Sequence, residues 1–371
     1  MSPENRDEIK IMEKQFGNFY PNAIDSHVHL FNCSLEGIEQ LTGFEHQFGY
    51  QAFNYLSCEC MDDCAQNALG IYLKLIAPQN YAFGGLHYRY DHDYEEEARM
   101  LIELGFDGMK MVENKPTVRK RLNMAANDPR YDGFYTYMEK NRIPMIIHIG
   151  DPEEFWDKDA IPAWAYAAGY YYGDGTFVSK EQLYEETLAV LERFPKLTAV
   201  FAHFFFMSAE KDRLGRLLDI YPNIGVDIVA GTEMYFNFSK DPAGTRKFFM
   251  KYQDRIIFGT DNMNLTDSTD INNALITNRM EHEFLMNDCE IPVWDKHILG
   301  IGLPQEVQDK IFKLNFQKLA GNKPKAINKE AAMDYLKKRL MDKRLRLTQR
   351  ERDIIQAVYE FCKDFSIKNH C

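Results

Sequence analysis

Four apolar stretches of the sequence each end in a residue that can bind a metal ion. They are AIDSHVH (23–29), PMIIH (144–148), LTAVFAH (197–203) and RIIFGTD (255–261). Short continuous apolar runs are typical of strands that are buried on both faces of a parallel sheet. In such folds the active site lies at the carboxyl ends of the strands, where these histidines and this aspartate fall. The pattern therefore predicts a metal site assembled from several strands.

The chemistry expected of these residues is hydrolysis with a metal-activated water. Side chains alternate along a strand, so His27 and His29 point the same way and can bind one ion together. With His148 and Asp261 they would supply three nitrogens and a carboxylate oxygen, a set that suits zinc, with manganese, iron, cobalt or nickel as alternatives. Such an ion lowers the pKa of its bound water from ~16 toward ~7. Asp261 would take and return that proton, and His203 would orient the water or polarise a substrate carbonyl.

The elements that must position these residues alternate along the chain. Further strands are expected at residues 51–57, 81–88, 106–112 and 223–229, and helices at 61–76, 94–104, 131–141, 180–194, 209–221 and 243–252. This alternation requires parallel pairing with right-handed crossovers, and eight strands favour a closed barrel. We predict an α/β fold of the TIM (β/α)8 type, with an N-terminal segment (1–21), a barrel domain (22–321) and a helical C-terminal extension (322–371).

Two regions lie outside this alternation. Residues 151–179 are long, aromatic and rich in glycine and proline, and they follow the strand that ends at His148. A lid over the site is the functional interpretation of this segment, and packing against a loop or subunit is the alternative. The C-terminal extension is strongly charged, which indicates either a basic patch or, in our preferred interpretation, a solvated helix pair with interleaved acidic residues.

Composition narrows the function classes. The chain of 371 residues is 45% hydrophobic, which is typical of a globular protein with a sizeable core. A formal charge of −12 argues against nucleic-acid or anionic-membrane partners and favours a small-molecule substrate, with a homo-oligomer left open. Seven cysteines, without an apolar leader in the first twenty residues, predict reduced thiols and a cytoplasmic location.

The order of these motifs resembles the amidohydrolase superfamily, and within it the amidohydrolase-related (amidohydrolase 2) branch. The resemblance is carried by IDSHVH (24–29), GFDGMKM (105–111), FP (194–195) ahead of His203, IFGTD (257–261) and IFKLN (311–315). It implies a distorted (β/α)8 barrel and a metal-dependent reaction on a small, carboxylated substrate. Members of the branch include lactonases, decarboxylases and hydratases.

Two departures from the family pattern affect the predicted pocket. The run Phe204-Phe205-Phe206 follows His203, where many relatives have a small residue, and is expected to narrow the pocket. Lys110 stands where members with two metals carry a carboxylated lysine. We favour a single ion, with Lys110 binding substrate or pairing with Asp261, and a second ion if Lys110 is carboxylated.

The sequence leaves three functions open. The first is a hydrolase acting on an ester, lactone or amide, and the second is a decarboxylase or hydratase that uses the same site. The third is a non-catalytic metal-binding barrel, against which Asp261 and His203 argue. Arg89, at the end of the strand expected at 81–88, is a further candidate for binding a substrate carboxylate as a bidentate pair.

Overall fold

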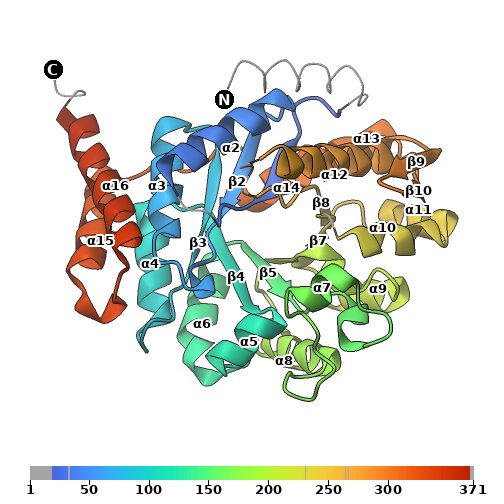
Figure 1. Cartoon of the computed structure of the whole chain (residues 1–371), viewed down its shortest axis with the longest axis horizontal. Helices are drawn as coiled ribbons and strands as arrows, with labels where there is room; N and C mark the ends of the chain where they lie inside the picture. The colour runs from blue at the N-terminus through green and yellow to red at the C-terminus, as the bar shows by residue number, and fades with distance from the viewer. Residues whose placement is uncertain (1–18, 32–33, 230, 264, 266, 368–371) are drawn as a thin grey trace.

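The computed structural model describes residues 19–31, 34–229, 231–263, 265 and 267–367, so most of the predicted N-terminal segment lies outside it. Among these residues eight parallel strands follow one another in sequence order around a barrel (Figure 1). The strands are β1 (Ile24–Val28), β2 (Ala52–Leu56), β3 (Tyr81–Gly85), β4 (Gly108–Asn114), β5 (Met145–Ile149), β6 (Ala199–Phe201), β7 (Ile224–Asp227) and β8 (Ile256–Ile257). The predicted TIM-barrel fold is confirmed.

Backbone hydrogen bonds between the last and first strands close the barrel. Ser26 N donates to Phe258 O at 3.2 Å, and Asp261 N donates to His27 O at 2.9 Å. Strand β8 is shorter than the predicted stretch because the chain leaves the extended conformation here, and Asp261 has a positive φ of 56°. This bend carries the Asp261 carboxylate from the end of β8 toward β1.

The inside of the barrel is apolar at its amino-terminal end. Side chains that alternate inward along the strands, such as Leu56, Phe83, Ile146 and Val200, form one buried cluster, and Phe316 from the closing helix packs against it. Burying these side chains stabilises each strand by removing apolar surface from water on both faces of the sheet. Polar groups are therefore concentrated at the opposite, carboxyl-terminal end.

Helices cover the outside of the barrel (Figure 1). They are α2 (Leu35–Gln47), α3 (Gln66–Ile76), α4 (Tyr94–Leu104), α5 (Pro116–Leu122), α6 (Asp132–Asn141), α7 (Ala163–Ala167), α8 (Lys180–Arg193), α9 (Lys211–Ile220), α10 (Thr232–Ser239), α11 (Pro242–Lys251), α12 (Ser268–Met286), α13 (Gln305–Asp309) and α14 (Asn315–Ala320). The six helices expected from the sequence are present with shifts of at most five residues at an end. Helices α2, α5, α7, α10 and α12 and a hairpin of β9 (Glu290–Val293) and β10 (Lys296–Leu299) were not predicted. None of the described helices is long and apolar enough to cross a membrane.

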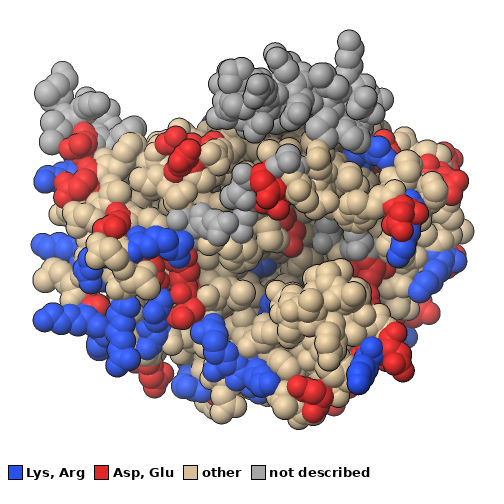
Figure 2. Space-filling view, viewed as in Figure 1, with Lys and Arg blue, Asp and Glu red and all other residues tan. Residues whose placement is uncertain are grey.

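The C-terminal extension is an antiparallel pair of helices, α15 (Lys329–Met341) and α16 (Gln349–Ile367), that packs against α4 and α3 (Figure 1). Its apolar residues Leu336, Ile355 and Val358 are buried, so the pair is joined to the barrel by a core of its own. Figure 2 shows Lys and Arg gathering over this side of the molecule with Asp and Glu among them. The helical prediction is confirmed, and the mixed charges agree with a solvated outer face.

Candidate metal centre

Three of the predicted ligands meet at the carboxyl-terminal end of the barrel. The Nε2 atoms of His27 and His29 are 3.1 Å apart, and Oδ1 of Asp261 lies 3.7 Å and 3.5 Å from them. Both imidazoles are buried, whereas the Asp261 side chain is about one-fifth exposed. One strand supplies both histidines and the bend after β8 supplies the carboxylate, so barrel closure itself brings the three together.

The outer nitrogens of both histidines are held by other groups. His27 Nδ1 lies 2.8 Å from Oδ2 of Asp227, at the end of β7, and His29 Nδ1 lies 3.0 Å from the carbonyl oxygen of Leu56. These acceptors require the ring proton on Nδ1, which leaves the Nε2 lone pairs directed toward the common point. Burial, and for His27 next the Lys110 ammonium, holds the pKa of both imidazoles well below the usual range. Neutral imidazoles in this tautomer fit a divalent metal ion.

His148 and His203 stand beside this cluster. Their rings are 4.9 Å apart between centroids, and the His203 ring lies 5.6 Å from that of His27. His148 Nε2 contacts Gly150 O at 2.9 Å and Asp151 Oδ1 at 3.4 Å, so that nitrogen is turned away from the cluster. Burial lowers the pKa of His148 to about 4 and that of His203 to about 3. The fourth ligand role of His148 and the catalytic role of His203 remain predictions.

Lys110 projects from β4 into the same end of the barrel. Its Nζ lies 3.1 Å from Nε2 of His27, and burial lowers the pKa of this amine. This contact is with His27, whereas the sequence predicted that Lys110 binds substrate or pairs with Asp261. The position confirms an inward-pointing lysine and leaves the number of metal ions open.

Two of the three phenylalanines after β6 do not form the expected wall, whereas Phe206 packs against His148 and His203. Residues 203–206 all have positive φ values between 50° and 58°, a left-handed turn that costs roughly 1–2 kcal/mol per residue. Phe204 packs outward against Phe238 and Phe249, and Phe205 stacks on Phe201. The prediction that the run narrows the pocket is therefore wrong for these two side chains. Burial of the rings offsets the strain, and the turn leaves His203 near His148.

A cavity of about 580 Å³ opens above the cluster. Polar groups of the site line its floor, and apolar side chains line its walls. The described lining residues include His29, Lys110, His148, His203 and Asp261, then Phe31, Val112, Tyr170 and Met263, and finally the exposed Met61, Asp62 and Arg350 with the buried Asp63. The cavity therefore joins the predicted ligands to a mixed apolar and charged entrance.

The segment predicted as a lid borders this cavity. Tyr170 reaches the lining, and Phe155, Ala165 and Tyr172 form a small buried cluster within the segment. The Tyr172 hydroxyl donates to Asp151 Oδ2 at 2.6 Å, next to His148. Internal packing gives the segment a defined shape at the site.

Arg89 lies behind the described lining of the cavity, paired with the lining residue Asp62. Its Nε lies 2.9 Å from Asp62 Oδ1 and its Nη2 lies 2.8 Å from Glu351 Oε1 of α16, and it is not among the described residues that line the cavity. These surroundings give its predicted substrate-binding role no support. A sequence alone places Arg89 after a strand, but the strand ends at Gly85 and the chain then turns toward the C-terminal extension.

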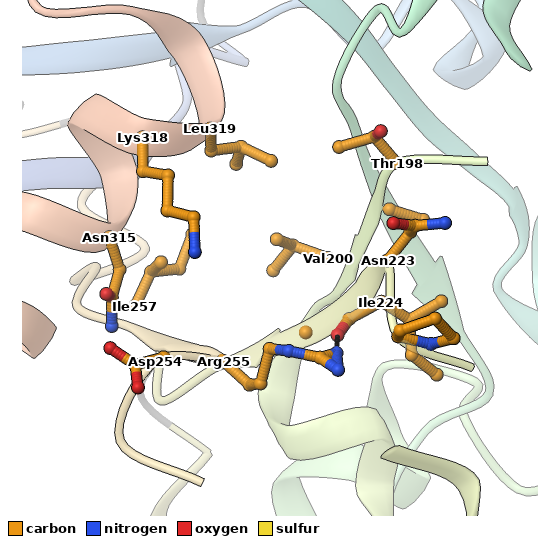
Figure 3. Close-up of a pocket in the computed structure, with 13 residues that line it drawn as sticks. Thr198, Val200, Asn223, Ile224, Asp254, Arg255, Ile257, Asn315, Lys318 and Leu319 are labelled. Atoms are coloured by element: carbon orange, nitrogen blue, oxygen red, sulfur yellow. Dashed lines mark hydrogen bonds between the residues drawn. The ribbon is translucent and has the colours of Figure 1, made fainter. Parts of the chain in front are cut away.

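Two other groups of polar residues have structural explanations. His87, His92 and Glu97 have ligand atoms within 4.8 Å of one another, but Glu97 also accepts a hydrogen bond from Arg339 at 3.1 Å. A smaller hollow of about 230 Å³ lies at the amino-terminal ends of β6–β8 (Figure 3), where Arg255 donates to the carbonyl oxygen of Ile224 at 2.7 Å. Activity in barrels of this type resides at the opposite end.

Sequence reasoning missed Asp227 and did not connect Cys58 with His29. Asp227 is fully buried and contacts both His27 and the backbone N–H of His203, at 2.6 Å. Cys58 Sγ lies 3.4 Å from His29 Nδ1. An aspartate at the end of the expected strand 223–229 was the one available signal, because carboxyl ends of neighbouring strands converge.

The eight-stranded parallel barrel carries a histidine pair at the end of its first strand and an aspartate after its eighth. Residues 24–319 match the family model described as amidohydrolase. The chain belongs to this family and is an enzyme of the amidohydrolase superfamily. The family is generally metal-dependent, in agreement with the candidate ligands at the end of the barrel.

Solved structures with similar chains are distant in sequence. A TIM-barrel protein of Bordetella bronchiseptica is 17% identical over 85% of this chain and 90% of its own, with a TM-score of 0.47. The IDCase of Metarhizium anisopliae is 13% identical over 81% and 97%, with a TM-score of 0.48. The search of curated proteins found no match. The fold assignment therefore rests on the strand pairing and the family assignment on the matched residues.

Proposed function

We propose that this enzyme hydrolyses an ester, lactone or amide bond of a small carboxylated substrate. The reaction would use one divalent metal ion, for which we propose zinc. One observation carries the proposal: the Nε2 atoms of His27 and His29 and a carboxylate oxygen of Asp261 converge at the floor of a cavity of about 580 Å³. The tautomers of both histidines suit metal binding, and the cavity is of a size typical of small-molecule sites.

The residues take the following roles. His27, His29 and Asp261 would hold the ion, with His148 as the predicted fourth ligand through its other ring nitrogen, because its Nε2 contacts Gly150 O. The ion would supply a water of lowered pKa as nucleophile. Asp261 accepts the proton of the attacking water and returns it to the leaving group. Burial raises the pKa of Asp261 to about 7, and a cation beside it would favour the ionised carboxylate. His203 polarises the substrate carbonyl, and Lys110 binds a carboxylate of the substrate.

Metal content tests the site directly. Elemental analysis of the purified protein should find about one equivalent of a divalent transition metal, and His27→Ala and His29→Ala should each lose it. His282→Gln is the matched control, because His282 is a fully buried histidine on α12 that bonds the backbone N–H of Tyr20. Equal metal content in all of these variants would overturn the site.

Activity assays then separate the chemistry. The metal-loaded protein should release acid from members of a panel of esters and lactones, followed with a pH indicator. Release of CO2 from small carboxylic acids without ester hydrolysis would favour the decarboxylase alternative instead. A cytoplasmic location is part of the proposal and is tested by fractionation.

A further inference from the structure

The C-terminal extension reaches the cavity of the metal site. Arg350, on α16, lines the cavity, although it stands beyond residue 319, where the family match ends. Its Nη2 donates to Oδ2 of Asp63 at 2.6 Å. Asp63 is itself buried and accepts the N–H of Ala65 at 3.0 Å, so the guanidinium is tied to a carboxylate that the backbone orients.

Buried contacts fix α16 to the loop after β2. Glu351 is 1% exposed and accepts the N–H of Cys64 at 2.7 Å and a guanidinium N–H of Arg89 at 2.8 Å. From α15, Arg339 is also buried, pairs with Glu59 and donates to the carbonyl oxygen of Cys64 at 3.0 Å. Breaking a buried charge pair of this kind is strongly destabilising, so Arg350 is held at the entrance by a rigid anchor.

Cations occur at different depths of the cavity. Lys110 lies at the floor beside His27, and Arg350 lies half-exposed at the entrance. A third lining cation, Lys115, is paired with Asp151 at 2.6 Å. The walls between Lys110 and Arg350 include the apolar side chains Val112, Phe31 and Tyr170. A ligand that fits the cavity from its floor to its entrance has an acid group at the metal site, an apolar spacer along the walls, and a second carboxylate at the entrance. Among the side chains, the arginine guanidinium fits a carboxylate best, because its planar N–H groups can donate two parallel hydrogen bonds to the two oxygens.

We propose that Arg350 binds a carboxylate of the substrate remote from the metal ion, so that the C-terminal extension selects substrates with two acid groups joined by an apolar spacer. This inference rests on the proposed function, because it uses the metal site as the other anchor. Arg350 thereby takes the role that the sequence assigned to Arg89, while Arg89 helps to hold Glu351 in place.

The test compares matched acids on the zinc-loaded full chain. Titration calorimetry measures the dissociation constants of malonate, succinate, glutarate and adipate and of the monocarboxylates with the same number of carbons. At one or more lengths the dicarboxylate should bind about 10-fold or more tightly, the scale of one charge-assisted pair. Arg350→Gln should reduce this ratio to about one, and Arg350→Lys should give an intermediate ratio because the charge remains without the fork.

Arg352→Gln is the matched control, because Arg352 is an exposed arginine of the same helix that bonds Leu340 O and is not among the described lining residues. It should retain the wild-type ratio, and the thermal midpoint and zinc content should be equal in all variants. A ratio of one in the wild type at every length, or an unchanged ratio in Arg350→Gln, would overturn the inference. If elemental analysis finds no zinc in the protein, the proposed function is refuted rather than the role of Arg350.

Discussion

Replacing Asp227 by Asn tests whether the metal site depends on a residue that touches no metal. Asp227 Oδ2 lies 2.8 Å from His27 Nδ1, and Oδ1 accepts the N–H of His203 at 2.6 Å. Asn preserves the shape and one acceptor oxygen. Its amide nitrogen, however, would face a ring N–H of His27. We expect His27 to move its proton to Nε2, where the proton blocks the metal.

The size of the effect follows from this single contact. A hydrogen bond to a charged group contributes about 1.5–3 kcal/mol, and 1.4 kcal/mol is a tenfold change in affinity. Loss of an outer partner of a metal-binding histidine typically weakens metal affinity about 10–100-fold. The two scales agree, so Asp227→Asn should raise the zinc dissociation constant by about 10–100-fold. Burial already raises the pKa of Asp227, and removal of its charge should therefore cost the metal-free protein little stability.

The assay is a competitive zinc titration against a chromophoric chelator, together with urea denaturation of the metal-free protein. The control is Asp107→Asn. Asp107 is another buried carboxylate, placed just before β4 at the amino-terminal end of the barrel, and it pairs with the buried Lys74 of α3. Loss of the Asp107 charge should destabilise the metal-free protein and leave zinc affinity unchanged. Asp227→Asn should instead weaken zinc binding and leave that stability nearly unchanged. If Asp227→Asn binds zinc as tightly as the wild type, the tautomer argument is refuted.

Further outcomes are expected at four positions. Asp261→Asn should lower kcat by about 10²–10⁴-fold with little change in KM, since Asn cannot accept the proton of water; near-normal turnover would transfer the base role to His203. Lys110→Met should leave about one equivalent of metal by elemental analysis, whereas loss of a second equivalent would establish a two-metal site. Deleting residues 162–173 removes Tyr170 from the cavity lining and should raise KM and lower kcat with the circular dichroism spectrum retained; an unfolded product would make the segment a packing element. Burial raises the pKa of Glu113 from 4.5 to about 7, so the folded state binds the extra proton and stability should fall by up to about 3 kcal/mol as pH rises from 4.5 to 8. Glu113→Gln should abolish that slope in urea denaturation at several pH values, and an unchanged slope would contradict the assignment.

The strands and their order were predictable because their signal is local. A run such as PMIIH is apolar on both faces, and only a parallel sheet covered by helices buries it. The inward direction of His27 and His29 also follows from alternation along one strand. Strand β8 was predicted too long, because nothing local reports that Asp261 must bend toward β1 with a positive φ.

Contacts between residues that are far apart in the sequence could not be predicted from local sequence patterns. Asp227 contacts His27 across 200 residues, and no periodicity reports such a contact. The Phe204-Phe205 pair was assigned to the pocket because a sequence does not reveal a left-handed turn that sends both rings outward. Arg89 was predicted at the site from its place after a strand, yet its partner is a carboxylate of the C-terminal extension.

The sequence by itself determined the barrel, the end of the barrel that carries the site, and the residue types that could bind a metal ion, since each depends on short-range pattern. Tertiary structure decided which of these atoms converge, which tautomers the histidines adopt, and that α16 contributes Arg350 to the cavity. These decisions depend on closure of the barrel and on docking of the extension. Both are set by the summed packing of many distant side chains rather than by any one segment.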